Sequence, residues 1–179
     1  MNRVWELELD VDSFDLEEEG KAEEELDGVD ITTLQEVGTG EKNKRKTYGL
    51  FEEIMEDVPS SDEWTGWDYD QFIERIYERP VFSPDCTIIA EKDDRFIGMI
   101  IQYYVEEEND IYTGIGGVRR EHRDKGVATA MLTRAVKTAE KKGVSKMKTE
   151  SRNESVLKIL QNLGFDKKPG RIQFEKVLE

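Results

Sequence analysis

A strand-like run leads through a basic, glycine-containing turn into a long helical pattern, and this feature restricts the fold most. The run spans residues 111–118, the turn reads Arg-Asp-Lys-Gly-Val-Ala over 123–128, and the helical pattern continues to residue 142. Backbone N–H groups at a helix start lack intrahelical partners and the helix dipole is positive there, so an anion completes their bonding. Arg123 and Lys125 add positive charge, and small Ala128 removes bulk. The pattern predicts a pyrophosphate-binding turn between a strand and a helix.

Two common nucleotide-binding motifs do not fit this turn. A Rossmann G-x-G-x-x-G would use Gly114 and Gly116 and then require glycine at Arg119, and a P-loop would require Gly-Lys-Ser/Thr. The turn instead resembles the R/Q-x-x-G-x-G/A signature of the GCN5-related N-acetyltransferase (GNAT) family, which reads Arg123-x-x-Gly126-x-Ala128 here. In that family the signature follows a strand and opens a helix that grips the pyrophosphate of acyl-CoA.

Two further segments are similar to the family. Val118 stands five residues before Arg123, where the family's fourth strand ends and offers backbone groups to the pantetheine arm. Downstream, Asn153-x-x-Val156 and then residues 163–165, Leu-Gly-Phe, match the family's last helix and its ending. The resemblance covers residues 86–178 best, is weaker over 29–85 and is thin before residue 29. It implies that acetyl-CoA is held by Gly116, Gly117, Val118, Arg123, Asp124, Lys125, Gly126, Val127, Ala128, Thr129, Asn153 and Lys158.

Hydrophobic periodicity predicts an α/β (α+β) fold. Strands are expected at 4–11, 29–34, 86–91, 95–105, 111–118 and 144–149, with two more over 165–178, and helices at 16–26, 41–55, 68–78, 126–142 and 154–163. The resemblance adds a mixed, mostly antiparallel central sheet with splayed middle strands and helices on both faces, the acyl-CoA N-acyltransferase fold. We expect residues 1–28 to form an acidic extension, with a strand and a helix, and residues 29–179 to form the acyltransferase domain.

Charge is concentrated in the N-terminal segment. The chain of 179 residues has a formal net charge of -15, and its first 30 residues hold 13 acidic residues against Arg3 and Lys21. Such acidity disfavours binding to nucleic acid and to anionic membranes. The strand at 4–11 is expected to pair across a homodimer or to cover its own sheet edge, because an exposed edge invites association.

Other sequence features assign no partner. The single cysteine, Cys86, cannot form an internal disulfide and is expected to be buried and structural. No apolar run approaches the roughly 20 residues of a membrane span, and the acidic start is unlike a signal peptide. We therefore expect a cytoplasmic protein, and no motif calls for a metal.

The resemblance implies an acyl-CoA-dependent N-acyltransferase, most simply an N-acetyltransferase acting on a primary amine in a ternary complex. The acyl group would enter a gap between residues 112–118 and 146–150, and a backbone N–H near Val118 would stabilise the developing oxyanion. Gly116 and Gly117 suit such a gap because a strand without side chains lets a ligand approach. Paired glycines are also common at a β-bulge that binds nothing.

The residues that would move protons depart from the family pattern. Tyr112 stands where some relatives carry a glutamate base, and a pKa near ~10 makes it a poor base. Asp57 and Glu56 are candidate bases acting through water, as are Glu52 and Asp110. Leu160 replaces the tyrosine that protonates the leaving thiolate in many relatives, so Tyr112 or water would do so, or the thiolate would leave unaided. The alternative is a CoA-binding regulatory or interaction module without turnover.

Several polar and aromatic residues have two interpretations each. Asn153 fits a cofactor contact and a helix N-cap equally, while Lys158 approaches the adenosine phosphate or is a surface lysine. His122 is expected to be a solvated turn residue. Trp64, Trp67 and Tyr69, with the turn at 57–59, would line the substrate site, with core packing as the competing interpretation for the tryptophans.

Overall fold

One twisted sheet organises residues 4–14, 26–58 and 66–169, which are the residues that the computed structural model describes. Its seven strands lie in the order β2-β3-β4-β5-β6-β1-β7. The strands are β1 (Trp5–Asp10), β2 (Asp30–Thr33), β3 (Ile88–Lys92), β4 (Arg95–Val105), β5 (Asp110–Val118), β6 (Lys146–Ser151) and β7 (Asp166–Lys168). The helices are α2 (Leu34–Val37), α3 (Glu41–Glu56), α4 (Tyr69–Phe72), α5 (Val127–Lys142) and α6 (Glu154–Asn162).

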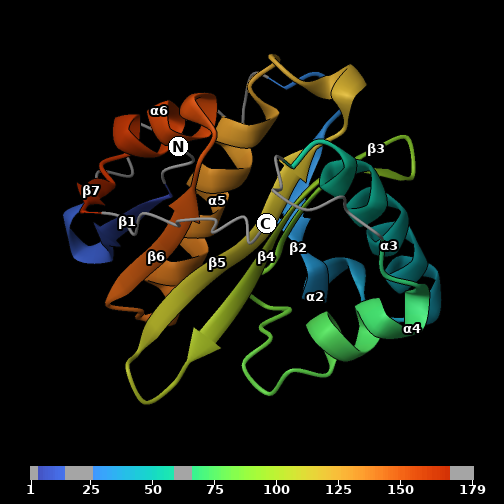
Figure 1. Cartoon of the computed structure of the whole chain (residues 1–179), viewed down its shortest axis with the longest axis horizontal. Helices are drawn as coiled ribbons and strands as arrows, with labels where there is room; N and C mark the ends of the chain where they lie inside the picture. The colour runs from blue at the N-terminus through green and yellow to red at the C-terminus, as the bar shows by residue number, and fades with distance from the viewer. Residues whose placement is uncertain (1–3, 15–25, 59–65, 170–179) are drawn as a thin grey trace, which may run out of the picture.

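Helices cover the sheet on two faces, as Figure 1 shows, and each face has its own apolar cluster. Met131 of α5 packs closely over Gly98 of β4, on the face that also receives α6. Ile54 of α3 packs over Gly117 of β5 on the other face, within the cluster that α4 joins. The predicted mixed α/β fold with helices on both faces is therefore confirmed.

The predicted antiparallel meander is formed by β3, β4 and β5. Strands β3 and β4 are joined by a tight turn in which Asp93 and Asp94 have φ of 51° and 57°. Such left-handed values at both central residues are typical of hairpin turns that match the strand twist. The pairing of β4 with β5 shifts register between Ile100 and Gln102, which marks a bulge close to the glycines of β5.

The middle strands of the sheet separate as predicted. Strands β5 and β6 are parallel, and their paired residues are Asp110 with Lys146, Ile111 with Met147 and Tyr112 with Lys148. Beyond Tyr112, β5 continues to Val118 and β6 continues to Ser151, but the two strands are no longer paired with each other. The register therefore leaves a gap that starts after Tyr112 and Lys148, which we call its closed end, and widens toward Val118, its open end.

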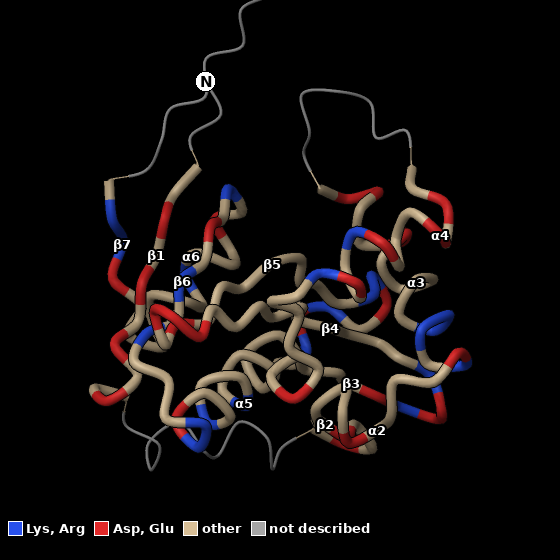
Figure 2. The backbone as a smooth tube through the Cα atoms, turned by 90° about the horizontal axis from the view of Figure 1, so that it is seen from below, with Lys and Arg blue, Asp and Glu red and all other residues tan. Residues whose placement is uncertain are grey.

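The N-terminal strand belongs to the chain's own sheet. β1 pairs antiparallel with β6 on one side and with β7 on the other, so it lies between two strands that follow it by more than a hundred residues. Leu7 and Leu9 are buried in the cluster that α5 and α6 join, and Glu6 and Glu8 alternate with them along β1. Figure 2 shows that charged residues are frequent along β1, β6 and β7. Of the two predicted arrangements for this strand, the structure shows pairing within one chain.

Some expectations differ from the structure in detail. The helix expected over 68–78 begins at its predicted cap, Asp68, but α4 passes at Ile73 into one wider π-helical turn that ends at Tyr77. In α6, Leu157 and Leu160 are the buried residues. The helix expected over 16–26 and the last expected strand lie almost wholly outside the described residues. No helix within the described ranges is long and apolar enough to cross a membrane.

Candidate functional site

The start of α5 has the backbone conformation that the anion-binding turn requires. Gly126, its N-cap residue, has φ of 82°, and Asp124 has φ of 59°. Glycine adopts such values without steric cost. As a glycine, the N-cap residue has no side chain to cap the helix, and the first backbone bond joins the Ala130 N–H to the Gly126 carbonyl at 3.0 Å. The amides of Val127, Ala128 and Thr129 thus precede the helical ladder, as an anion site needs.

The two basic side chains of this turn are engaged within the protein. Arg123 donates from Nε to the Val118 carbonyl at 2.8 Å and from Nη2 to Asp57 at 2.6 Å. Lys125 donates from Nζ to the Glu121 carbonyl at 2.8 Å. The sequence suggested that both cations contribute charge to the turn, and the structure shows that each also braces it.

Asp57, a candidate base, lies at the centre of an ion-pair network at the open end of the gap. Arg120 binds it through Nε, at 3.1 and 2.9 Å to the two oxygens, and through Nη2 at 2.6 Å. The hydrogen bonds from Arg120 and Arg123 lower the pKa of Asp57 to about 2. A carboxylate with so low a pKa takes up a proton weakly at neutral pH. Glu56, the neighbouring candidate, contacts Arg120 at 3.2 Å.

A second carboxylate of α3 extends this network by one helical turn. Glu53 is ion-paired with Arg119 and accepts from the Arg120 N–H at 3.2 Å. Arg119 also donates from Nε to the Phe96 carbonyl at 2.8 Å, which ties the turn after β5 to the start of β4. Sequence reasoning missed Glu53, Arg119 and Arg120 because their partners are more than 60 residues apart in the chain.

Gly116 and Gly117 lie beside the gap, but Gly117 has a packing role as well. A Cβ at Gly117 would come within 2.9 Å of Ile54, and one at Gly116 would lie 3.4 Å from the Met99 carbonyl oxygen. The absence of a side chain at Gly117 therefore lets α3 pack directly on β5. Val118, which ends the strand, is buried with 6% of its surface exposed.

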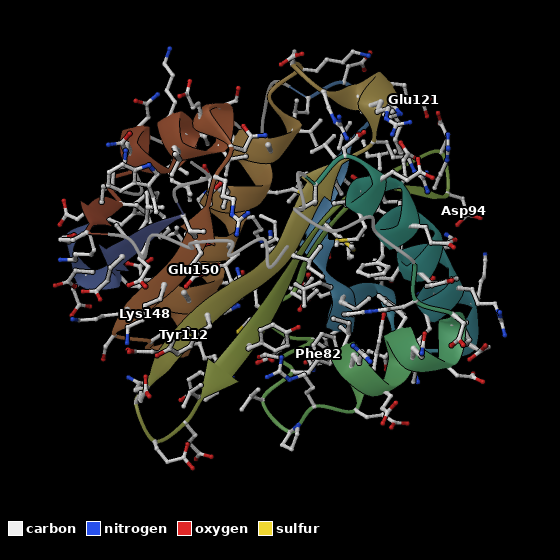
Figure 3. All side chains as sticks on the ribbon, in the orientation of Figure 1. Phe82, Asp94, Tyr112, Glu121, Lys148 and Glu150 are labelled. Atoms are coloured by element: carbon white, nitrogen blue, oxygen red, sulfur yellow. The ribbon has the colours of Figure 1, made fainter. Side chains whose placement is uncertain are left out.

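The closed end of the gap carries a compact group of polar side chains, which Figure 3 shows across β5 and β6. Lys148 binds Asp110 at 2.6 Å and donates to the Tyr112 hydroxyl at 3.2 Å. Tyr112 in turn donates to Glu108 at 2.6 Å. The bond to Asp110 raises the pKa of Lys148, and the bond to Glu108 raises the pKa of Tyr112. Lys148 therefore stays charged and Tyr112 stays protonated at neutral pH.

The structure also shows where four other candidate residues lie, three at or in α6 and one in the turn after β5. Leu160 is 2% exposed, so it faces the core and offers no proton donor. Asn153 caps α6, and its Oδ1 accepts from Ser155 N at 2.9 Å, which confirms the capping interpretation. Lys158 is exposed, and His122 is half-buried rather than fully solvated.

The aromatic residues expected at a substrate site pack partly into the core. Trp67 stacks on Phe51 with ring centroids 5.2 Å apart, which confirms core packing for this tryptophan. Tyr69 packs edge-on against Tyr48 at 5.5 Å. Trp64 lies outside the described residues. Within the described part of the chain, no three His, Cys, Asp or Glu side chains are grouped in a way that could hold a metal ion.

Comparisons with known proteins agree with this geometry. The profile of the "Acetyltransferase (GNAT) family" matches residues 48–165. No curated protein matches the chain. Among solved structures, a GCN5-related N-acetyltransferase from Sphaerobacter thermophilus superposes with a TM-score of 0.70 at 19% sequence identity. That match covers 92% of this chain but 48% of the other, so the chain spans about half the length of that protein.

Two further solved structures are similar over more of their own length. A ribosomal-protein-alanine N-acetyltransferase from Brucella melitensis has a TM-score of 0.58 and 17% identity, covering 85% of this chain and 99% of its own. The enzyme AAC(6′)-Iy, solved with the bisubstrate analog CoA-S-monomethyl-acetylneamine, has a TM-score of 0.57 and 19% identity, covering 84% and 99%. At sequence identities this low, the similarity to these structures shows a shared fold and no more.

Proposed function

Because this chain belongs to the acetyltransferase (GNAT) family, we propose that it transfers an acetyl group from acetyl-CoA to a primary amine in a ternary complex. The observation that carries the proposal is the gap between β5 and β6, which opens beside an α5 N-terminus without a side-chain cap. Together they provide a channel for an acyl-pantetheine arm and a site for its diphosphate. The amides of Val127, Ala128 and Thr129 hold the diphosphate, and Asn153 and Lys158 lie toward the adenosine end.

The reaction is a direct attack on the thioester. The neutral amine nitrogen bonds to the thioester carbonyl carbon, a backbone N–H near Val118 stabilises the oxyanion, and the carbon–sulfur bond then breaks. The amine loses one proton to water, and the departing thiolate gains one. A thiolate is a modest base with a pKa near ~8.5, so its departure needs little assistance.

Tyr112 is our proton donor for the thiolate. Its hydroxyl is kept protonated by the bond to Glu108, which raises the pKa of Tyr112. Leu160, at the position where many relatives carry a tyrosine, is buried and cannot donate. Asp57 is better suited to hold arginine than to accept a proton, because its pKa is about 2. The amine proton therefore passes to solvent, either directly or through the carboxylate of Glu56 or Glu52.

A CoA-binding module without turnover is the second candidate function. It is favoured by one observation: the Tyr112 hydroxyl already donates to Glu108, while Leu160 faces the core. Such a protein would hold acetyl-CoA through the α5 N-terminus and respond to it without transferring the acetyl group.

We also propose a division of the chain into an acidic extension, residues 1–28, and an acyltransferase domain, residues 29–179. Strand β1 of the extension lies within the sheet, between β6 and β7. Because both edges of β1 are paired within the chain, a homodimer through this strand requires its exchange between two copies, and that arrangement stays a prediction. Deletion of residues 1–12 followed by measurement of the solution mass tests it, and an unchanged oligomeric state would count against the dimer.

Two measurements separate the candidate functions. Calorimetric titration with acetyl-CoA should show saturable binding, and the absence of binding at millimolar concentration would reject both. Thiol release is then measured over a panel of amines that includes aminoglycosides and alanine peptides, because similar solved structures include an aminoglycoside acetyltransferase and a ribosomal-protein-alanine N-acetyltransferase. Thiol release with at least one amine supports the transferase. Binding of acetyl-CoA without thiol release in the presence of any of the amines supports the module.

A further inference from the structure

The end of α3 and the turn after β5 are joined by an arrangement of opposite charges that the reaction itself does not explain. Glu53 and Asp57 are four residues apart, so they share one face at the end of α3. Three arginines, residues 119, 120 and 123, reach that face from the other side of the open end. All five residues therefore lie between the end of α3 and the start of the turn at 123–128.

Asp57 uses both carboxylate oxygens in this arrangement. Oδ1 accepts from Arg120 at 2.6 and 3.1 Å, and Oδ2 accepts from Arg120 at 2.9 Å and from Arg123 at 2.6 Å. Planar guanidinium groups that meet a carboxylate through two donors are fixed in orientation as well as in distance. Asp57 itself is fixed, because its N–H bonds the Ile54 and Met55 carbonyls at the end of α3.

Arg123 passes this constraint on to the strand. Its Nη2 binds Asp57, and its Nε donates to the Val118 carbonyl at 2.8 Å, so one rigid guanidinium spans the carboxylate and the last residue of β5. We propose that Asp57 is a positioning residue for acyl transfer, which acts through Arg123 to fix Val118 and the pantetheine-binding end of β5. This inference rests on the proposed function.

The effect of removing Asp57 distinguishes this positioning role from a simple effect of charge. If Asp57 only neutralised Arg120 and Arg123, its removal would free two cations beside the diphosphate site and strengthen CoA binding. If it fixes Val118, its removal loosens the strand that contacts the pantetheine arm. The first effect depends on the phosphates of the donor, and the second does not.

Asp57→Asn tests this difference, since it removes the charge with little change in volume. Its kcat/KM is compared with that of the unmodified protein for acetyl-CoA and for acetyl-pantetheine, which lacks the diphosphate. We expect a loss of about tenfold with both donors, the size of one charge-assisted hydrogen bond. Tighter binding of acetyl-CoA with unchanged use of acetyl-pantetheine would overturn the proposal.

A double variant tests whether Arg123 transmits the effect. Arg123→Gln should lower kcat/KM for acetyl-pantetheine by a similar factor, and adding Asp57→Asn should lower it no further, because linked residues are not additive. Multiplicative losses in the double variant would show that Asp57 acts by another route and would contradict the proposal.

Asp94→Asn is the matched control, because Asp94 lies in the turn between β3 and β4 and binds the first half of α3. Asp94 binds two cations of α3, Lys46 at 2.6 Å and Lys42 at 3.3 Å, and Figure 3 shows it beside α3 and apart from Tyr112 and Lys148. Its replacement should leave kcat/KM unchanged with both donors. An equal loss in Asp94→Asn would mean that α3 is merely destabilised.

A readout without turnover keeps this inference separate from the proposed function. Backbone amide exchange over residues 118–123 should become about tenfold faster in Asp57→Asn than in Asp94→Asn, because the turn loses its fixed arginines. If the protein neither binds acetyl-CoA nor releases thiol, the proposed function fails while this measurement still reports on the link. Unchanged exchange would contradict the positioning role.

Discussion

The two ends of the gap between β5 and β6 are both lined by charged residues, but the charges are arranged differently. At the open end, Asp57 and the arginines are paired across two separate elements of the chain. At the closed end, Lys148 bridges β6 to Asp110 and Tyr112 of the neighbouring strand. The open end holds the turn that we propose as the diphosphate site, whereas the closed end holds the strands together where their pairing stops. Binding and folding should therefore respond to different substitutions.

The largest effect is expected at the open end, from Gly126→Val. A branched residue at φ of 82° is strained by about 1 to 2 kcal/mol, and its Cβ would lie 3.7 Å from Leu26, so the turn that presents the amides to the anion has to change shape. We expect the Kd for acetyl-CoA to rise by on the order of 100-fold, measured by calorimetric titration.

Gly143→Val is its control, at the opposite end of α5. Gly143 has φ of 78°, and a Cβ there meets nothing within 4 Å. This variant should lose a similar amount of stability to denaturant and keep its affinity for acetyl-CoA. If both variants lose affinity equally, the helix start is not the binding site and the comparison between the two ends fails.

A smaller effect, on folding, is expected at the closed end from Lys148→Met. Asp110 is 5% exposed, so removal of its partner leaves a buried carboxylate with one fewer hydrogen bond. We expect a loss of about 2 kcal/mol in the free energy of unfolding. The Kd for acetyl-CoA should change by less than about twofold, in contrast to the large rise expected for Gly126→Val.

Lys46→Met is the matched comparison for that substitution. Lys46 also binds two carboxylates, but one of them, Asp94, is 72% exposed and remains hydrated when the lysine is removed. The loss should stay below about 1 kcal/mol. Equal losses in the two lysine variants would show that burial of Asp110 has no special importance.

The sequence predicted the open end better than the closed end for physical reasons. Glycine at a positive φ, unpaired amides at a helix start and small residues in the first turn are local properties, so the turn at 123–128 could be read directly. The helical and strand periodicities likewise predicted the meander, α3 and α5. These features depend on neighbours within one element, whereas the separation of β5 from β6 was expected only from the family resemblance.

The contacts that the sequence could not predict join distant segments. Nothing in residues 53–57 indicates that they meet arginines more than 60 positions later, and Gly117 gives no sign that Ile54 requires its missing side chain. The place of β1 between β6 and β7 was equally unreadable, because alternation specifies a buried face but not a neighbour. The sequence identifies Trp67 as an aromatic residue, but it does not indicate whether the ring contacts a ligand or packs against Phe51.

The chemical role of the closed end is tested by Tyr112→Phe. If the hydroxyl protonates the thiolate, kcat should fall by about tenfold, at the low end for acid catalysis because the leaving group is weakly basic. The Kd for acetyl-CoA should be unchanged. Tyr104→Phe, which removes a hydroxyl bonded to Asn109 at 3.0 Å, should leave kcat unaltered. An unaffected kcat in Tyr112→Phe would restrict the closed end to a structural role.

The smallest effect is expected from Asn153→Ser, which separates capping from cofactor binding. Serine caps a helix about as well as asparagine, so the free energy of unfolding should change by less than about 0.5 kcal/mol. The lost amide group should raise the Kd for acetyl-CoA by about threefold, as one weak hydrogen bond would. Asp68→Ser, at the N-cap of α4, should leave this Kd unchanged. An unchanged Kd in Asn153→Ser would limit Asn153 to its cap and confine the cofactor site to the start of α5.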